Sequence, residues 1–175
     1  MNAPRNEAFQ RFLRGSAMFG GLEGRSLESV VQRLQPIRLP AGKEVFSEGE
    51  LGRTMYIVYK GEVEVRRTSS TGAAVPIVRL GPGECFGEMA LVELQPRSAT
   101  VVATRPVTLY SMNNLDLYRL FREDNYAYVI VLQNICRLLS RRLRKADSRL
   151  CDFLAQPPAK NVVRPRPRRR TPARA

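Results

Sequence analysis

Short apolar runs separated by turn-forming residues fill the middle of the chain, and they constrain its fold more than any other feature. The runs fall at residues 37–39, 45–46, 55–59, 63–65, 75–80, 99–103 and 107–112. Glycine and proline punctuate them, as in Pro40-Ala41-Gly42, Lys60-Gly61 and Gly81-Pro82-Gly83. Runs of this length are strand-sized, and glycine-rich turns between them favour a β-sandwich, barrel or roll. The sequence therefore predicts a mainly β core.

Helical periodicity replaces this pattern on both sides of the core. Upstream, the apolar residues Phe9, Phe12 and Leu13, and then Leu27, Val30, Val31 and Leu34, recur at helical spacing. Ser26 is the expected N-cap of the second upstream helix. Downstream, Asn113 or Asn114 can cap a helix, and a longer helix is expected to start near Asp124. We therefore divide the chain into a β domain with flanking helices over 6–123, a long helix over 124–155 and a tail over 156–175.

The long helix carries a narrow apolar stripe. Its members are Tyr128, Leu132, Ile135, Leu139, Leu143, Ala146, Leu150 and Phe153. Steps of three and four residues are those of a coiled-coil seam. We expect the first two turns to pack on the domain's own core. Beyond Leu139 the polar side is rich in arginine, so we expect a partner helix there, and residues 128–153 become the candidate homodimer surface.

Positive charge gathers at the C-terminal end. The chain has a formal net charge of +13, and residues 137–175 hold 13 basic and 2 acidic residues. Residues 156–175 contain five prolines and seven basic residues without an acid, a composition that predicts disorder. Such a tail can associate with nucleic acid through phosphate contacts or with an acidic protein. The alternative is a tail that only solubilises the chain.

Composition argues against an enzyme, a metal site and a membrane span. The chain has no histidine, and its three cysteines are widely spaced. Histidine is the commonest general base and a common zinc ligand, so we expect neither catalysis nor a metal cofactor. The longest apolar stretches fall short of the roughly 18 residues that a membrane helix needs, and the N-terminus does not resemble a secretory signal. We expect a cytoplasmic protein.

The segment from Gly83 to Val101 joins two strand-like runs and has the chemistry of a phosphate site. Gly87 allows close backbone approach, and it precedes four residues that can form one helical turn, whose first N–H groups suit a phosphate. Arg97 follows Pro96, and a guanidinium can bind a phosphate through two hydrogen bonds. The Glu88 carboxylate can accept a hydrogen bond from a sugar hydroxyl. A glutamate and an arginine together therefore suit a nucleotide, which has both groups.

These residues also carry a family resemblance. Phe86-Gly87-Glu88-Met89-Ala90-Leu91, followed by Pro96-Arg97-Ser98-Ala99-Thr100-Val101, resembles the phosphate-binding cassette of cyclic-nucleotide-binding domains. The catabolite activator and the regulatory subunit of cAMP-dependent kinase are members of this family. The glycine-punctuated stretch from Pro40 to Val65 is similar to the family's strands. The resemblance covers roughly residues 10–150, and it implies an eight-stranded, jelly-roll-like β-roll flanked by N-terminal helices and a long C-terminal helix.

The resemblance also implies roles for individual residues. Glu88 is expected at the ribose 2′-hydroxyl and Arg97 at the cyclic phosphate, with backbone N–H groups near Ala90 and Ser98 completing the phosphate cradle. The implied ligand-binding set is Gly87, Glu88, Met89, Ala90, Arg97, Ser98 and Ala99. Val78, Leu80 and Phe86 are the candidates for packing near the base. We expect cAMP as the ligand, with cGMP as the second choice, and a regulatory module that signals through its C-terminal helices.

Two alternatives stay open at this point. Glu88 and Arg97 could form an ordinary surface ion pair, which contributes only about 0–1 kcal/mol. The fold could also be present without a ligand, since fold alone does not fix function. The chain would then act as an adaptor through its basic C-terminus. In transcription factors of the family a helix-turn-helix domain follows the long helix, whereas only the arginine- and proline-rich tail follows Leu154 here. We therefore expect a free-standing module.

Overall fold

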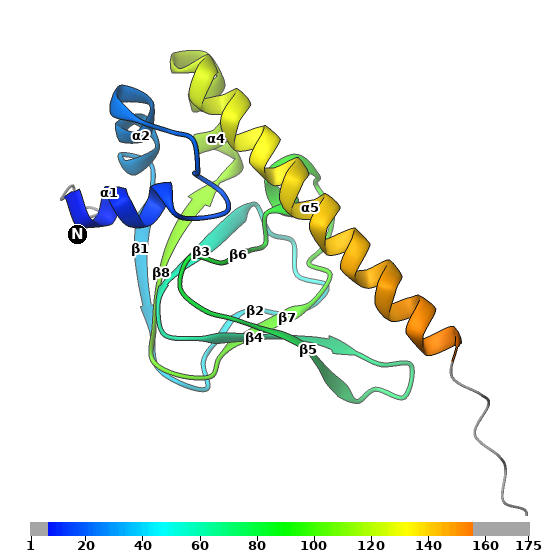
Figure 1. Cartoon of the computed structure of the whole chain (residues 1–175). Coiled ribbons are helices and arrows are strands. Elements are labelled where there is room, and N and C mark those ends of the chain that lie inside the picture. The colour runs from blue at the N-terminus through cyan, green and yellow to red at the C-terminus, as the bar shows by residue number, and fades with distance from the viewer. Residues whose placement is uncertain (1–6, 156–175) are drawn as a thin grey trace, which may run out of the picture. The chain divides into compact units, whose positions relative to one another are not determined.

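The computed structural model describes residues 7–155, in which eight strands form two four-stranded sheets (Figure 1). The strands are β1 (Gln35–Leu39), β2 (Glu44–Phe46), β3 (Thr54–Lys60), β4 (Val63–Thr68), β5 (Ala74–Leu80), β6 (Cys85–Phe86), β7 (Thr100–Ala103) and β8 (Val107–Asn113). One sheet has the order β1-β8-β3-β6 and the other β2-β7-β4-β5. Every strand pair is antiparallel. The predicted eight-stranded roll is confirmed.

Each of the seven apolar runs coincides with a strand, but the sequence pattern missed β6. This strand has only two residues, which pair with Tyr56 and Ile57 of β3. A two-residue strand leaves no alternation of apolar and polar positions, so periodicity cannot find it.

An inner core lies between the two sheets. Phe46, Val58, Val63, Leu80, Phe86, Val101, Ala103, Val107 and Leu109 form it, and each is at most 7% exposed. Residues alternate along β3, so that Tyr56 and Val58 point into this cluster while Met55 and Ile57 point to the opposite face of the sheet. Strand alternation thus gives the β1-β8-β3-β6 sheet two apolar faces.

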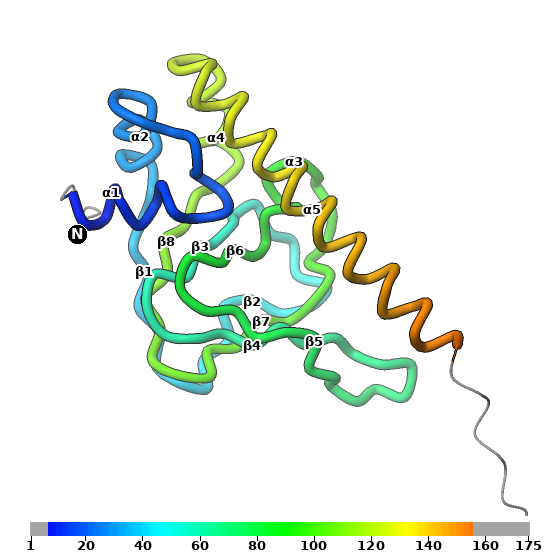
Figure 2. The backbone as a smooth tube through the Cα atoms, viewed as in Figure 1, coloured from blue at the N-terminus to red at the C-terminus, as the bar shows by residue number. Residues whose placement is uncertain are grey.

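Helices cover the second face of that sheet. They are α1 (Glu7–Arg14), α2 (Gly24–Val31), α4 (Asn114–Glu123) and the first part of α5 (Asn125–Leu154), and the single-turn α3 (Met89–Val92) follows β6. Phe9, Leu27 and Leu120 pack with Met55 and Ile57 in one buried cluster. In Figure 2 the helices α1, α2 and α4 gather beside β1 and β8.

The N-caps predicted for α2 and α4 have different outcomes. The predicted cap at Ser26 is wrong, because α2 starts at Gly24 and Glu23 is its N-cap. The Leu27 amide donates to the Glu23 carbonyl at 3.3 Å and so closes the first turn of the helix. The helix therefore starts three residues before Leu27, the first residue of the apolar periodicity. For α4 the cap is Asn113 and not Asn114. The Asn113 side chain accepts from the Asp116 amide at 2.9 Å, and the Asp116 carboxylate accepts from the Asn113 amide at 3.3 Å.

The first turns of α5 pack on the core, as expected, but Ile135 is the one member of the predicted stripe among the buried residues of this helix. Its buried residues are Ala127, Val131, Asn134 and Ile135, whereas Tyr128, Leu132 and Leu139 lie at the edge, partly buried. The Asn134 side-chain amide donates to the carbonyls of Met18 (3.0 Å) and Gly20 (2.8 Å). The predicted stripe was built from large apolar residues. It therefore left out the small Ala127 and the polar Asn134, which are buried in the structure.

The chain divides into two compact units, residues 1–140 and residues 141–175. Residues 141–155 of the second unit are exposed throughout. They include Leu143 (63% exposed), Leu150 (55%) and Phe153 (70%). The predicted disorder of residues 156–175 falls outside the described residues. Across residues 7–155, none of the helices combines the length and the apolar character that crossing a membrane requires.

Candidate functional site

The segment singled out in the sequence leaves β6 through a tight turn. Gly87 has a φ of +70°, in the left-handed region that favours glycine. The turn then closes into α3, with the Ala90 amide donating to the Gly87 carbonyl at 3.2 Å and the Leu91 amide to the Glu88 carbonyl at 3.1 Å. The predicted helical turn is present. The Ala90 N–H, expected in the phosphate cradle, already has an acceptor within the turn.

The main chain of Arg97 is fixed by the turn that follows β2. The Arg97 amide donates to the Glu50 carbonyl at 2.8 Å, and the Gly49 amide donates to the Arg97 carbonyl at 2.9 Å. Leu51 and Pro96 form an isolated β-bridge beside these bonds. The connection before β7 is therefore held in place although it belongs to no regular strand.

The Arg97 side chain turns inward and is 8% exposed. Its Nη2 donates to the Thr54 carbonyl at 2.8 Å and its Nη1 to the Gly87 carbonyl at 3.4 Å. Nε has no hydrogen-bond acceptor within residues 7–155. Burial lowers the pKa of the guanidinium, and the nearby charges of Glu50 and Glu88 oppose that shift. The site thus contains a desolvated cation that donates to neutral carbonyls.

Glu88 is 2% exposed and lies close enough to Arg97 to affect the pKa of the guanidinium. Because both side chains are buried, a solvent-exposed ion pair does not describe them. The structure thus brings together the glutamate and the arginine that stand nine positions apart in the sequence. A buried carboxylate and a buried guanidinium in one site offer an acceptor and a set of donors to a polar ligand.

The remaining predicted site residues fall into two groups. Around the turn, Ala90 and Ala99 are buried, Met89 is 44% exposed and Ser98 is exposed. Of the three residues predicted near a base, Leu80 and Phe86 are buried in the inner core and Val78 packs against it partly buried. Phe86 stacks on Tyr56 with ring centroids 5.3 Å apart.

Sequence reasoning missed three residues that hold Arg97. Phe46 lies under the guanidinium, whose Cζ is 4.0 Å from the ring centroid. Thr54 supplies a carbonyl acceptor. At Gly52 a Cβ would overlap Nε and Cζ of Arg97. Phe46 registers in the sequence only as a core residue and Gly52 only as a turn residue, and no spacing links either to position 97.

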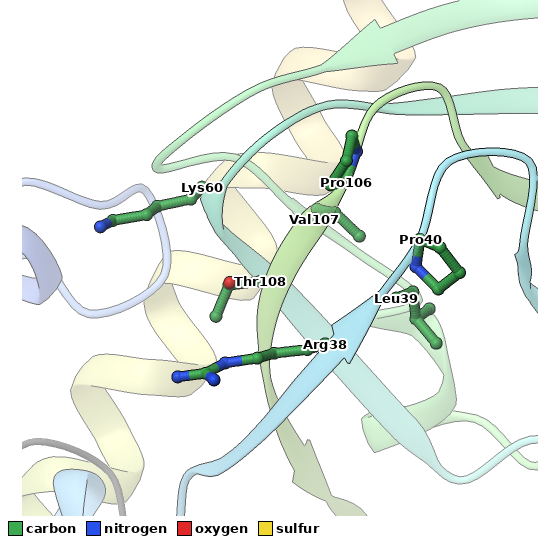
Figure 3. Close-up of a pocket in the computed structure, with 7 residues that line it drawn as sticks. All are labelled: Arg38, Leu39, Pro40, Lys60, Pro106, Val107 and Thr108. Atoms are coloured by element: carbon green, nitrogen blue, oxygen red, sulfur yellow. The ribbon is translucent and has the colours of Figure 1, made fainter.

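The structure also has an open surface pocket of about 470 Å³ away from this segment (Figure 3). Its lining comes from β1, β3 and β8 and the turns beside them: Arg38, Leu39, Pro40, Lys60, Pro106, Val107 and Thr108. Lys60 is at the end of β3 opposite Thr54, whose carbonyl binds Arg97. Seven residues of strand span about 20 Å, so this pocket is separate from the site around Arg97.

Known proteins with a similar sequence and fold define the class of this domain. Residues 36–124 match the family described as cyclic nucleotide-binding domain. A relative at 37% identity over 155 residues is the cyclic AMP receptor protein of Thermus thermophilus. The chain belongs to the cyclic nucleotide-binding domain family.

The match to the Thermus receptor covers 86% of this chain and 68% of that protein. A crystal structure of the catabolite activator protein of the same species has a TM-score of 0.71 at 36% identity, over 80% of this chain and 63% of that one. The regulatory subunit of cAMP-dependent protein kinase from Yarrowia lipolytica is 31% identical over 126 residues, 72% of this chain and 32% of that protein. The chain thus spans about two thirds of the bacterial regulators it matches.

Proposed function

We propose that this protein binds a cyclic mononucleotide, with cAMP as the preferred ligand, at the segment from Phe86 to Val101. The observation that carries the proposal is the buried guanidinium of Arg97, which donates to two neutral carbonyls and has an unused Nε donor in the described part of the chain. A desolvated cation of this kind favours an anion, and a cyclic phosphate carries a single negative charge. The names of the Thermus and Yarrowia relatives, both of which refer to cAMP, support the choice of base.

The two charged residues have different roles in this proposal. Arg97 binds the cyclic phosphate and Glu88 accepts a hydrogen bond from the ribose 2′-hydroxyl. Gly87 lets the backbone approach the ribose, and Met89, Ala90, Ser98 and Ala99 line the phosphate side. Val78, Leu80 and Phe86 are proposed near the base, although the burial of Leu80 and Phe86 in the inner core leaves Val78 as the most accessible of the three.

The role of Glu88 is tested with cAMP and 2′-deoxy-cAMP, each titrated into wild type and Glu88→Gln. Wild type is expected to bind cAMP at least about tenfold more tightly than the deoxy compound, since one charge-assisted hydrogen bond contributes about 1.5–3 kcal/mol. In Glu88→Gln the two ligands should bind within about threefold of each other. Equal preference for cAMP in both proteins would remove Glu88 from the ribose site.

The choice between bases is tested with cGMP and a cyclic dinucleotide in the same titration. We expect cAMP to bind more tightly than cGMP. A second phosphate makes a cyclic dinucleotide larger and doubly charged, and we expect it to bind more weakly than either mononucleotide. Tighter binding of cGMP would show that guanine is the preferred base, and the proposed phosphate site would stand.

We further propose that ligand binding is signalled through the C-terminal helix, as part of a homodimer. The exposure of Leu143, Leu150 and Phe153 supports this, because large apolar residues at coiled-coil spacing favour a partner helix. The alternative output is association of the basic C-terminal region with nucleic acid or an acidic protein, which the net charge of +11 over residues 137–175 favours. Loss of DNA affinity on deletion of residues 156–175 would support that alternative.

A further inference from the structure

The underside of the Arg97 guanidinium rests on an aromatic ring. Cζ lies 4.0 Å from the centroid of Phe46 and 6.0 Å from that of Tyr56. A cation over an aromatic face is attracted by the ring quadrupole, and the attraction grows when the pair is desolvated. Phe46 is 7% exposed and Arg97 8%, so both partners of this contact are shielded from water.

Phe46 is itself fixed by two more rings. Its centroid lies 5.9 Å from that of Tyr56 and 5.9 Å from that of Phe86, while Tyr56 and Phe86 stack at 5.3 Å. Phe46 comes from β2 of one sheet, and Tyr56 and Phe86 come from β3 and β6 of the other. The three rings therefore form a platform where the two sheets meet, and this platform is part of the inner core.

Two glycines leave the space that the guanidinium fills. At Gly52 a Cβ would overlap Nε and Cζ of Arg97, and at Gly87 it would lie 2.8 Å from Nη1. The guanidinium is thus enclosed by an aromatic face, two glycines and the carbonyls of Thr54 and Gly87. Such an enclosure leaves a long side chain few alternative rotamers.

We propose that Phe46 and Gly52 are positioning residues, which hold Arg97 in the orientation that binds the ligand phosphate. Each Nη donates one hydrogen bond to a carbonyl and Nε donates none within the described residues, so the guanidinium keeps unused N–H donors for an anion. A side chain ordered before binding loses less conformational entropy when the ligand arrives. This inference rests on the proposed cyclic-nucleotide site and assigns to it two residues outside the segment from Phe86 to Val101.

A double-mutant cycle on cAMP affinity tests the role of Phe46. The four proteins are wild type, Phe46→Leu, Arg97→Ala and the double variant. Phe46→Leu keeps an apolar side chain but removes the ring, and we expect it to weaken cAMP binding about 3- to 20-fold when Arg97 is present. In the Arg97→Ala background the same change should alter affinity less than about twofold, because the residue acts through the arginine. Phe19→Leu, a buried aromatic in the other core cluster, is the matched control and should lower stability without lowering affinity.

Gly52→Ala tests the enclosure independently. We expect it to weaken cAMP binding at least about tenfold, because the new methyl group must displace the guanidinium. Gly81→Ala is the control, since no atom lies within 4 Å of the Cβ position there. Retained affinity in Gly52→Ala would contradict the proposal.

The outcomes separate this inference from the proposed function. If Phe46→Leu weakens cAMP binding only when Arg97 is present, the result supports both the proposed function and this inference. If wild type binds cAMP and Arg97→Ala weakens it, but Phe46→Leu has the same effect in both backgrounds, Phe46 is a structural residue only and the inference is overturned alone. If wild type binds neither cAMP nor cGMP, the proposed function fails and the inference fails with it.

Discussion

Gly87 has to satisfy a backbone conformation and a packing constraint at once. Its φ is +70°, and a Cβ there would lie 2.8 Å from Nη1 of Arg97 and 3.1 Å from the Thr54 carbonyl oxygen. Gly72 provides a control with nearly the same φ, +81°, and no atom within 4 Å. The two glycines therefore separate the cost of the backbone conformation from the cost of contact with Arg97.

We predict that Gly72→Ala lowers the free energy of unfolding by about 1–2 kcal/mol, the usual cost of a left-handed conformation with a side chain. Gly87→Ala should lower it by at least about 1 kcal/mol more, because of the added contact. Urea unfolding of both variants measures the difference. Equal losses would show that the Arg97 side chain does not constrain Gly87.

Glu64 on β4 connects two arginines of the β4–β5 hairpin. Its carboxylate accepts from Nε of Arg66 at 2.7 Å and from Nε of Arg79 at 3.0 Å. These hydrogen bonds, from Arg66 and then from Arg79, lower the pKa of Glu64 below its usual value of 4.5. A lowered pKa in the folded state means that the ionised carboxylate stabilises the fold above pH 4.5, and that this stabilisation is lost as the pH falls through the folded-state pKa.

We therefore predict that Glu64→Gln lowers stability near neutral pH and that its deficit relative to wild type shrinks as the pH falls below 4.5. Thermal unfolding across a pH series is the measurement. Because the stabilisation depends on the ionised carboxylate, a deficit that stays constant down to the lowest pH would show that the pKa is not lowered.

At the residue scale, sequence and structure agree where one residue type has one distinctive chemistry. Gly87, Glu88 and Arg97 were selected from the sequence, and in the structure the Arg97 side chain reaches the Gly87 carbonyl, next to the buried Glu88. Phe46 and Gly52 were not selected from the sequence. Their proposed role depends on contact with Arg97, about fifty positions away in the chain. A phenylalanine in an apolar run is most simply a core residue, and only coordinates reveal the guanidinium above it.

At the scale of elements, the start of α4 has a capping arrangement that the sequence narrowed to two candidates. Asn113 accepts from the Asp116 amide and its own amide donates to the Asp116 carboxylate, so both ends of a capping box are made. Asn114 is the first residue of the helix and has no such role. Asn113 and Asn114 therefore allow the same substitution to be compared at the N-cap and one residue later.

We predict that Asn113→Ala lowers the free energy of unfolding by about 1 kcal/mol, the typical cost of losing an N-cap. Asn114→Ala should change it by less than about 0.5 kcal/mol, since Asn114 is only partly buried and makes no capping hydrogen bond. Chemical denaturation of the two variants compares them directly. A larger loss at Asn114 would mean that the helix begins one residue later.

Elements were predictable in proportion to their length. The seven apolar runs gave seven strands, whereas β6, with two residues, was missed. The long helix was expected near Asp124 and spans Asn125–Leu154, but its buried face is centred on Ala127, Val131 and Ile135. The buried face of this helix was predicted from large apolar side chains. Ala127 was left out because an alanine is small, although it is buried in the structure.

At the scale of the whole molecule, the two units differ in character. The first has two apolar cores, one on each face of the β1-β8-β3-β6 sheet. Residues 141–154 of the second are exposed, with the large apolar residues Leu143, Leu150 and Phe153 among arginines. The charge on such a helix would oppose self-association at low salt and oppose it less when salt screens the arginines.

We predict that the protein dimerises through this stretch and that the dimer tightens as salt is raised from about 0.1 M to 0.5 M, over which screening shortens the Debye length. Leu150→Asp should weaken the dimer at least about tenfold by placing a charge in the seam. Ser148→Asp adds the same charge outside the seam and should not weaken it. Sedimentation equilibrium measures both, and a monomeric wild type would rule out this surface.

The central claim is that Arg97 holds the phosphate of a cyclic mononucleotide, and calorimetric titration with cAMP tests it most directly. The proteins are wild type, Arg97→Ala and, as a control, Arg38→Ala at an exposed position on β1. We predict one site per chain in wild type, unchanged affinity in Arg38→Ala, and a loss of about 1.5–3 kcal/mol in Arg97→Ala, as for a hydrogen bond to a charged group. Absence of binding by wild type, or equal affinity in Arg97→Ala, would contradict the account.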